Sequence, residues 1–282
     1  MVACAALLFS LQPLIANALY EDGANAWGTV FLRFLVPALF LVFFVKRKNY
    51  FNKLIALILG AVLGGSAAAY YASIQYISSG LAVILLYTYP VIIFVIALAL
   101  KEDFLSIRKF VAVISAVSGI YISVGVINSS SITGILLALT AAGAFALYLL
   151  LSRRLLPDNG GLSMVGWVML GAVLFLLVPI AFGMTRFPTT LSGYGMGLIL
   201  SLFSGLIPIA MLTSGSYLMQ KDTDTGIILT LEPVGTFLLA WMFLSESLTI
   251  NTLVGFSMVV AAIVIMVLPQ RNRNLLTINS SG

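Results

Sequence analysis

Residues 81–100 read LAVILLYTYPVIIFVIALAL, a run of twenty residues without a charge. An apolar run of about twenty residues has the length of a helix that crosses a lipid bilayer. The rest of the chain has the same character, since 61% of its 282 residues are hydrophobic and only 8% are charged. A water-soluble domain carries roughly 25% charged residues. The sequence therefore predicts an all-α membrane protein and excludes a water-soluble fold.

Similar runs recur along the chain between short polar turns, and they predict ten transmembrane helices. The first run has no basic leader and no clear small-residue cleavage site, so we interpret it as a span and not as a removed signal peptide. The polar residues 270–282 are expected to form a cytoplasmic tail. The expected spans are 2–19, 26–45, 54–77, 81–100, 107–126, 133–152, 163–183, 195–219, 226–244 and 251–268.

Basic residues are distributed unevenly among the expected connections. Lys and Arg are enriched in the cytoplasmic connections of membrane proteins. With both termini in the cytoplasm, only Arg186 falls outside and Arg33 lies within a span. We therefore predict a multi-pass protein of the cell membrane with both termini cytoplasmic, and we do not interpret the net charge of +5 as nucleic-acid binding. The basic residues placed inside are Lys46, Arg47, Lys48, Lys53, Lys101, Arg108, Lys109, Arg153, Arg154, Lys221, Arg271 and Arg273.

The two halves of the chain share short motifs in the same order. Tyr-Pro-Val at 89–91 matches Glu-Pro-Val at 232–234, and Asp103 matches Glu246, both at an offset of 143. Weaker matches join 28–33 to 166–171 and 5–11 to 141–147. Five helices per half is an odd number, so the second copy would be inverted in the membrane. We predict two inverted five-helix repeats, 1–127 and 132–269, as in secondary transporters that bind solute near the bilayer midplane.

These motifs resemble those of the drug/metabolite transporter superfamily, in its ten-helix EamA-type branch. The resemblance covers essentially the whole chain and rests on Pro90 and Pro233, each followed twelve or thirteen residues later by an acidic residue and then Ser or Thr. The Arg-Phe pair at 33–34 and the Arg-Arg pair at 153–154 also fit. The resemblance implies a carrier of small metabolites that works by alternating access, similar to exporters of amino acids, nucleotide-related compounds or drugs. It does not specify the substrate.

Two charged residues, Arg33 and Glu232, lie deep within expected spans. A charge at bilayer depth costs roughly 3 kcal/mol or more, so such groups usually face a cavity or each other. Glu232 is a candidate for proton coupling or for binding a solute amine, and Pro233 would free a carbonyl beside it. Arg33 could hold a carboxylate or phosphate through a bidentate contact. It could equally pair with Glu232 as a structural partner, or extend toward the outer interface.

Further polar and aromatic residues of the spans are candidate solute contacts. Tyrosine belts at the membrane interface and polar contacts between helices explain such residues as well. Pro90 and Pro233 hold equivalent places in the two halves and are expected to act as hinges. Besides Arg33 and Glu232, the candidate solute contacts are Gln12, Tyr71, Gln75, Tyr87, Tyr148 and Ser214.

Two other patterns are interpreted as structural. Gly60, Gly64, Gly65 and Ala68 space small residues by about four along one span, which is typical of a close-packing helix face. Asp103 and Glu246 fall on opposite sides of the expected membrane and cannot form one acid–base pair. We expect each of the two carboxylates to cap the helix that follows it.

The chain has no histidine and one cysteine, so an internal disulfide and the usual metal ligands are lacking. No metal or cofactor is expected, and no enzymatic activity. We predict a secondary transporter, with export as the favoured direction, of a small polar or amphipathic metabolite such as an amino acid. Proton coupling through Glu232 is an added hypothesis. A passive channel, a membrane scaffold and a membrane-embedded enzyme acting on lipid are the alternatives, and the protein is expected to be a monomer or a homodimer.

Overall fold

In the computed structural model of the chain, the described residues are 1–43, 50–101, 106–124, 132–156, 161–218, 228–246 and 249–268. Their side chains are described except at 50–52, 124, 161–163, 213–218 and 267. All regular structure within these ranges is helical, and no strand occurs there. The prediction of an all-α protein is therefore confirmed for this part of the chain.

Seven helical segments are long and apolar enough to cross a bilayer. They are Val2–Glu21, Ala26–Phe43, Lys53–Ile74, Ser79–Ala99, Ile132–Leu155, Met164–Ala181 and Leu191–Leu212. Two shorter apolar helices, Leu231–Phe243 and Ile250–Met266, follow in the C-terminal part. The chain is a multi-pass membrane protein, whereas the count of ten spans and the inversion of the halves stay predictions.

Several of the expected spans are divided into more than one helix. The expected run at 195–219 also begins earlier, at Leu191, because the side chain of Thr190 accepts a hydrogen bond from Gly193 N and caps the helix there. In chain order the elements are α1 (Val2–Phe9), α2 (Gln12–Glu21), α3 (Ala26–Phe43), α4 (Tyr50–Ile74), α5 (Ser79–Leu86), α6 (Tyr89–Ala99), α7 (Ile107–Val124), α8 (Ile132–Leu155), α9 (Gly161–Ala181), α10 (Leu191–Ser201), the π-helical η2 (Leu202–Leu206), α11 (Ile207–Leu218), α13 (Leu231–Phe243) and α14 (Ile250–Val267).

Two of the breaks have the same local cause. Proline has no N–H and leaves the carbonyl four residues earlier without its helical donor. Pro13 follows the break between α1 and α2, where Ser10 Oγ donates to Leu7 O at 2.6 Å. Pro90 follows the break between α5 and α6, where Thr88 Oγ1 donates to Leu85 O at 2.7 Å. In both places a hydroxyl bonds to the backbone three residues back and the chain bends.

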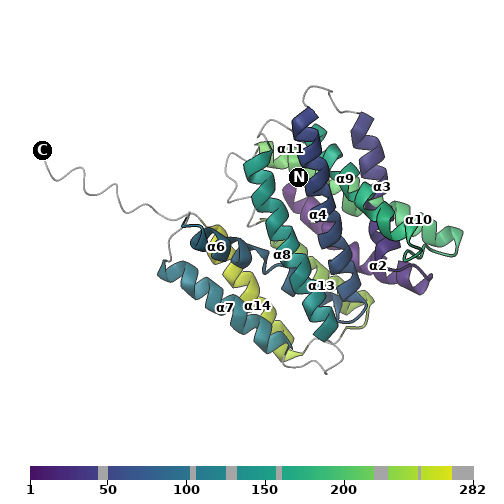
Figure 1. Cartoon of the computed structure of the whole chain (residues 1–282). Coiled ribbons are helices and arrows are strands. Elements are labelled where there is room, and N and C mark those ends of the chain that lie inside the picture. The colour runs from purple at the N-terminus through teal and green to yellow at the C-terminus, as the bar shows by residue number, and fades with distance from the viewer. Residues whose placement is uncertain are drawn as a thin grey trace, which may run out of the picture.

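Helices α3, α4, α8 and α9 pack into the main body of the bundle, with α4 in contact with both α8 and α9 (Figure 1). The predicted small-residue face of α4 is confirmed, because it lies directly on α9. A Cβ added at Gly60 would collide with the Val168 carbonyl, and one added at Gly64 would lie 3.2 Å from Ala172. Close backbone approach of this kind is the usual basis of helix association in lipid.

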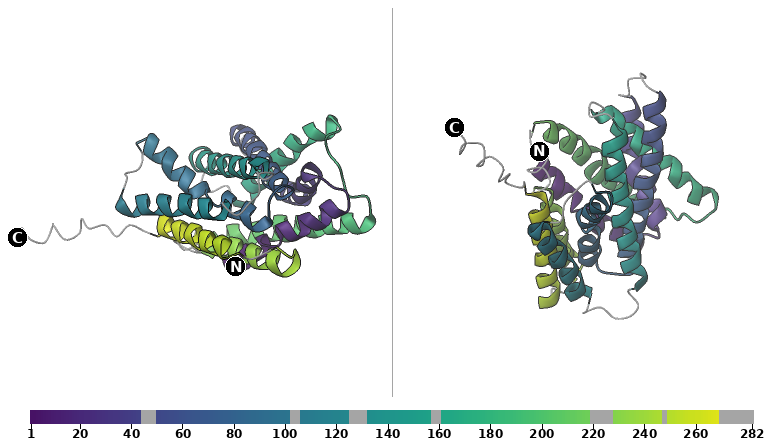
Figure 2. Two further views of the ribbon diagram at one scale, coloured as in Figure 1. Left: turned by 90° about the horizontal axis from the view of Figure 1, so that it is seen from below. Right: turned by 60° about the vertical axis from the view of Figure 1, so that its left-hand side comes forward.

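Helices α7 and α14 form a second tight pair, at the edge of the bundle, and the views of Figure 2 keep them side by side. Their contacts run antiparallel, since Arg108 Nε donates to Ile265 O at 3.0 Å and Ser115 Oγ donates to Met258 O at 2.9 Å. A Cβ added at Gly119 would lie 2.6 Å from Gly255 O, so both helices need glycine where they cross.

Candidate functional site

Glu232 lies in the first turn of α13, where this helix meets the end of α5. The Tyr87 hydroxyl is 2.8 Å from Glu232 Oε2 and 3.2 Å from Leu229 O, so its proton serves either acceptor. Leu229 O lies four residues before Pro233, which has no N–H to offer it. The carboxylate and the freed carbonyl thus form the polar notch expected beside Pro233. The N-terminal turn of a helix also favours a negative charge, which suits the carboxylate of Glu232.

Arg33 lies within α3 and is partly buried. Its Nε donates to Ser204 O, at 3.3 Å, in the π-helical segment η2. Pro208 follows four residues later and has no N–H, so Ser204 O lacks its α-helical donor and is open to Arg33. The guanidinium carbon lies 5.2 Å from the ring centre of Phe34 and 5.7 Å from that of Tyr71. These cation–π contacts stabilise the charge in apolar surroundings.

A second proline frees the carbonyl of Arg33 itself. Pro37 lies four residues after Arg33 within α3, and Ser201 Oγ donates to Arg33 O at 3.1 Å. Gly205 allows η2 to approach this bond, since a Cβ there would lie 2.9 Å from Arg33 O and 2.7 Å from Pro37 Cγ. The contact between α3 and η2 therefore uses carbonyls that prolines have released on both helices.

Tyr71 joins Gln12 to the Arg33 side of the site. Tyr71 is fully buried, its hydroxyl donates to Gln12 Oε1 at 3.3 Å, and its backbone carbonyl accepts from Tyr20 Oη at 2.7 Å. Its ring also meets the ring of Tyr70 edge-on at 5.6 Å. The structure thus brings Gln12, Tyr71 and Arg33 into one connected group.

Tyr148 connects to the Glu232 side through a row of aromatic rings. Tyr87 contacts Tyr89 at 5.7 Å, Tyr89 contacts Phe145 at 4.9 Å, and Phe145 contacts Tyr148 at 6.0 Å between ring centres. Tyr89 and Phe145 complete this row, although neither was among the candidate solute contacts.

Arg33 and Glu232 do not form an ion pair in the part of the chain that the structure describes. Each has its own partners, Ser204 O for Arg33 and the Tyr87 hydroxyl for Glu232. The alternative in which they form a fixed structural pair is therefore not what this structure shows.

Of the other two candidates, one lies elsewhere and one has a side chain that is not described. Gln75 lies just beyond the end of α4, in an exposed turn, and Ser214 lies in α11 with its side chain outside the described residues. Pro90 lies in the first turn of α6 and Pro233 is the third residue of α13, so both follow a helix start; their role as hinges stays a prediction.

Ser204 was missed from the sequence. Its side-chain hydroxyl is buried without a partner among the described residues, while its carbonyl holds Arg33. The proline four residues later was the available signal, because it marks Ser204 O as an acceptor without a helical donor. Among the described residues, no group of three or more Cys, Asp or Glu side chains could hold a metal ion.

The expectation that Glu246 caps the following helix is wrong. Its two carboxylate oxygens accept from Ser79 N at 2.6 Å and Gly80 N at 3.2 Å, at the start of α5. The following helix, α14, is capped instead by Thr249, whose hydroxyl accepts from Thr252 N. Backbone N–H groups at a helix start can bind any carboxylate that reaches them, so a residue distant in the sequence can cap the helix. Asp103 lies outside the described residues.

Asp22 plays a similar role at the start of α10. Its Oδ2 accepts from Thr190 N at 3.2 Å and from Thr190 Oγ1 at 2.9 Å, and its Oδ1 accepts from Thr189 Oγ1 at 3.1 Å. Desolvation alone would raise the pKa of Asp22, but these hydrogen bonds outweigh it and hold the pKa below its usual value. The nearby Asn25 ties the same two connections together, since Asn25 Nδ2 donates to Met184 O at 2.7 Å.

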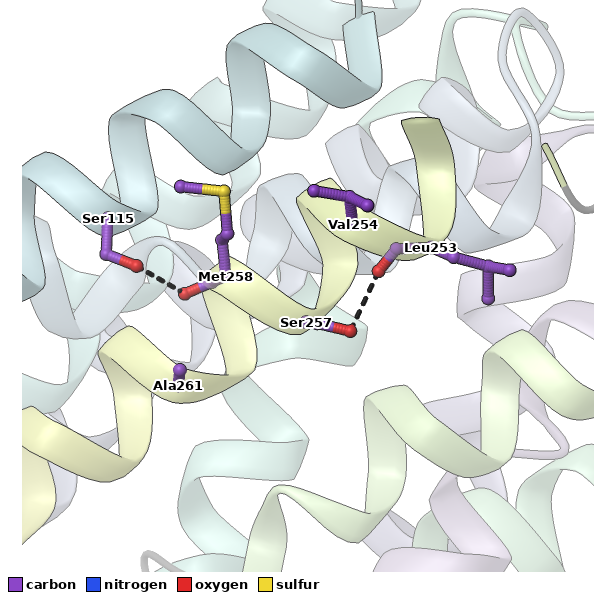
Figure 3. Close-up of a pocket in the computed structure, with 6 residues that line it drawn as sticks. All are labelled: Ser115, Leu253, Val254, Ser257, Met258 and Ala261. Carbon is purple, nitrogen blue, oxygen red and sulfur yellow. Dashed lines mark hydrogen bonds between the residues drawn. The ribbon is translucent and has the colours of Figure 1, made fainter. Parts of the chain in front are cut away.

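An open pocket of about 400 Å³ lies on the α7–α14 pair, away from Arg33 and Glu232, and Figure 3 shows its lining. Its hydroxyls are already occupied, because Ser115 Oγ donates to Met258 O and Ser257 Oγ donates to Leu253 O. Because both hydroxyls donate their protons within the helix pair, they can offer a solute only acceptor oxygens. The lining residues are Ser115, Leu253, Val254, Ser257, Met258 and Ala261.

Comparison with known proteins points to one family. The model of the EamA-like transporter family matches residues 1–125 and again residues 132–268. The threonine/homoserine exporter RhtA of Escherichia coli is 27% identical over 270 residues, which cover 88% of each chain. The protein of the same name from Salmonella typhimurium is 27% identical over 92% of this chain and 84% of its own. The uncharacterized transporter YcbK of Bacillus subtilis is 24% identical over 84% of this chain and 81% of its own.

A solved crystal structure of a protein shares the fold. It aligns over 94% of both chains with a TM-score of 0.63, at 17% sequence identity. The helical arrangement described above is therefore one that a crystallised protein also adopts.

Proposed function

The chain belongs to the EamA-like transporter family, and on that premise we propose that it is a secondary transporter that exports a small polar or amphipathic metabolite, such as an amino acid, by alternating access. The family and the names of its relatives indicate a transporter and not an enzyme. The relatives named RhtA are threonine/homoserine exporters by name, so small hydroxylated amino acids are the first solutes to test.

The observation that carries this proposal is the pair of ionisable side chains inside the apolar bundle. Arg33 and Glu232 are both partly buried, they do not pair with each other, and each has only part of its hydrogen-bonding capacity used by the described residues. An unpaired charge at this depth has a high free-energy cost unless a polar partner binds to it. A solute that is carried through the bundle supplies such a partner.

The α7–α14 pair supports the proposed inversion of the two halves. Ser115 contacts Met258 at a separation of 143 residues, the offset of the sequence repeat. Adding the same offset to Ala112 and Gly119 gives Gly255 and Ala262. Gly119 contacts Gly255, so a repeat with this offset predicts a matching contact between Ala262 and Ala112. These two alanines do lie in one buried cluster. An antiparallel pair with this property has a local two-fold axis across it, as inverted repeats require.

The caps of these two helices are also equivalent. Ser106 Oγ accepts from Lys109 N before α7, and Thr249 Oγ1 accepts from Thr252 N before α14. Both the capping residues and the N–H groups that they bind are separated by 143 positions. The equivalence supports an ancestral duplication, with repeats at 1–127 and 132–269.

The orientation and the coupling complete the proposal. Both termini are cytoplasmic, because twelve basic residues then lie inside and one outside. Glu232 carries the coupling proton, since a carboxyl group with a single hydroxyl partner among the described residues can gain or lose a proton without breaking a fixed ion pair. Pro90 and Pro233 are the hinges of the two halves.

The test is transport by purified protein in proteoliposomes, with a panel of amino acids and other small metabolites, with and without a pH gradient. We expect saturable exchange of at least one solute, faster with a gradient, and loss of the gradient response in Glu232→Gln. The matched control is Glu21→Gln, which changes an exposed carboxylate at the end of α2.

The outcome separates the alternatives. An intact gradient response in Glu232→Gln would remove the coupling role and leave the transporter. Flux that rises without saturation would indicate a passive channel. Lipid turnover by the purified protein that Glu232→Ala abolishes would indicate an enzyme.

A further inference from the structure

We propose that the site recognises a zwitterion, with the solute carboxylate bound by Arg33 and the solute ammonium bound by Glu232. The inference rests on the proposed transport function and goes beyond it, because it names the two charged groups that every substrate must carry. It also assigns each group to one residue. Neither a simple amine nor a simple carboxylate would satisfy both residues.

Arg33 is held so that part of the end of its side chain stays available. The contact with Ser204 O uses Nε, and the guanidinium carbon lies 5.2 Å from the ring centre of Phe34 and 5.7 Å from that of Tyr71. Tyr71 also accepts a hydrogen bond from the Arg33 side chain. A guanidinium has five N–H donors, so these two contacts leave donors for a further partner. The N–H groups of a guanidinium form the fork that binds a carboxylate through two parallel bonds.

Buried hydroxyls next to Arg33 also lack partners. Thr29 lies one helical turn before Arg33 on α3, and Ser204 provides the carbonyl that holds it. Thr29 Oγ1 and Ser204 Oγ are both buried without a hydrogen bond to the described residues. Buried polar atoms are almost always hydrogen-bonded, so unpaired ones beside a cation mark a place for a polar guest.

Glu232 offers a matching acceptor. Oε2 is bonded to the Tyr87 hydroxyl, and Oε1 has no partner among the described residues. Leu229 O, which Pro233 leaves without a helical donor, lies beside it and shares the same hydroxyl. An ammonium group has three donors and can bind a carboxylate oxygen and a carbonyl together.

The break between α1 and α2 links the two charges into one site. Thr236, one turn after Glu232 on α13, donates to Ser10 O at 3.4 Å. Gln12, two residues after Ser10, accepts from the buried Tyr71, whose ring centre lies 5.7 Å from the guanidinium carbon of Arg33. An ion pair completed by the solute replaces the direct Arg33–Glu232 pair that the structure lacks. The cost of two separated charges in lipid is then offset only when a zwitterion is bound, which favours the loaded carrier over the empty one.

The test uses wild-type protein and three related probes in proteoliposomes. The probes are L-threonine, 1-aminopropan-2-ol, which lacks the carboxylate, and 3-hydroxybutanoate, which lacks the ammonium. A charge-assisted hydrogen bond contributes roughly 10- to 150-fold in affinity. We therefore expect each single-charge probe to exchange at least about 10-fold less well than L-threonine.

Two variants assign the groups. In Arg33→Gln, L-threonine should fall to within about 3-fold of 1-aminopropan-2-ol, because the carboxylate no longer contributes. In Glu232→Gln, L-threonine should fall to within about 3-fold of 3-hydroxybutanoate. Arg33→Lys keeps the charge without the fork and should fall between wild type and Arg33→Gln. A purely structural role would lower exchange of all three probes in proportion and leave their ratios unchanged.

Each result decides between clear outcomes. If wild type carries a solute without a carboxylate or without an ammonium as well as it carries L-threonine, the zwitterion assignment fails and the transport function stands. Unchanged probe ratios in both variants would also overturn the assignment. If no solute of the broader panel is exchanged, the transport function itself fails, and the assignment with it. The probe comparison in wild type needs no variant, so it holds even if Arg33→Gln does not fold.

Discussion

Charged groups in the connections and charged groups within the bundle are treated differently by this fold. Asp22 and Glu246 lie at the starts of α10 and α5, and both oxygens of each carboxylate accept hydrogen bonds. Arg33 and Glu232 lie among apolar helices, where hydrogen bonds would be worth more, yet each keeps free donors or acceptors within the described structure. The charged groups within the bundle, where an unpaired group costs more, therefore have fewer partners than those in the connections.

The difference separates two uses of charge. A carboxylate whose two oxygens both accept from backbone N–H or hydroxyl groups of the fold is a permanent part of it, and its removal costs stability. On the proposed function, a charge left incomplete at bilayer depth is completed by the solute, so its removal should lower transport. The following predictions test this distinction, beginning with the largest expected effect.

Glu232→Gln should reduce exchange of the preferred zwitterionic solute about 10- to 100-fold, since one charge-assisted contact to the solute is lost. The free energy of unfolding should change by no more than about 1 kcal/mol, because Gln keeps an acceptor for Tyr87. The measurements are initial exchange rates and unfolding in increasing SDS. Glu21→Gln is the control for both. A loss of several kcal/mol in stability with unchanged exchange would show that Glu232 stabilises the fold and does not contact the solute.

Glu246→Ala should destabilise the protein by about 1–3 kcal/mol, because two N–H groups at the start of α5 lose their acceptors. Glu246→Gln retains one oxygen and should lose less. Unfolding in SDS measures the change, and the exchange rate per folded molecule should fall by less than in Glu232→Gln. Equal stability of wild type and Glu246→Ala would show that these bonds are not structural.

The stabilising effect of Asp22 should depend on pH. Its pKa in the folded protein is lowered by the bonds from Thr189 and Thr190, so its stabilising effect is complete above its ordinary value of about 4. The effect is lost as pH falls through the lower folded-state value. The melting temperature of wild type should therefore exceed that of Asp22→Asn at pH 7, and the two should converge in acid. A gap that persists undiminished at low pH would contradict this role for the charge.

Ser204→Ala should have the smallest effect. It removes a hydroxyl without a partner among the described residues and leaves the carbonyl that holds Arg33, so stability should stay within about 0.5 kcal/mol of wild type. If the hydroxyl contacts solute, KM should rise about 2- to 10-fold. Ser257→Ala, which removes a hydroxyl bonded to Leu253 O on α14, is the control and should leave KM unchanged.

Much of the fold follows from hydropathy, because a helix in lipid must satisfy its own backbone and must therefore be long and apolar. The run at 81–100 is such a case, and it lies in the structure as the segment Ser79–Ala99. The break within it, at Tyr87 and Thr88, follows from Pro90 together with a hydroxyl that bonds three residues back. The small-residue face around Gly60 was also readable, since only close packing needs that spacing.

The site was only partly readable. Arg33 and Glu232 stood out because charge is rare in apolar runs, and Tyr87 meets Glu232 as part of the same polar notch. Gln75 lies in an exposed turn, because a polar residue near the end of a run lies there as easily as in a cavity, and its role as a solute contact stays a prediction. Glu246 was misplaced because the helix start that it reaches depends on tertiary packing, which local sequence does not encode.

The bonds from Glu246 to Ser79 and Gly80 make two connections that lie far apart in the sequence into a single mechanical part. Any rearrangement that separates the segment before α14 from the start of α5 must first strip a carboxylate from two backbone amides. The rate of such a rearrangement would therefore depend on breaking these two hydrogen bonds and not on the flexibility of a connecting loop. Water or an anion that accepts hydrogen bonds from the same two amides in place of Glu246 would lower the barrier to this separation.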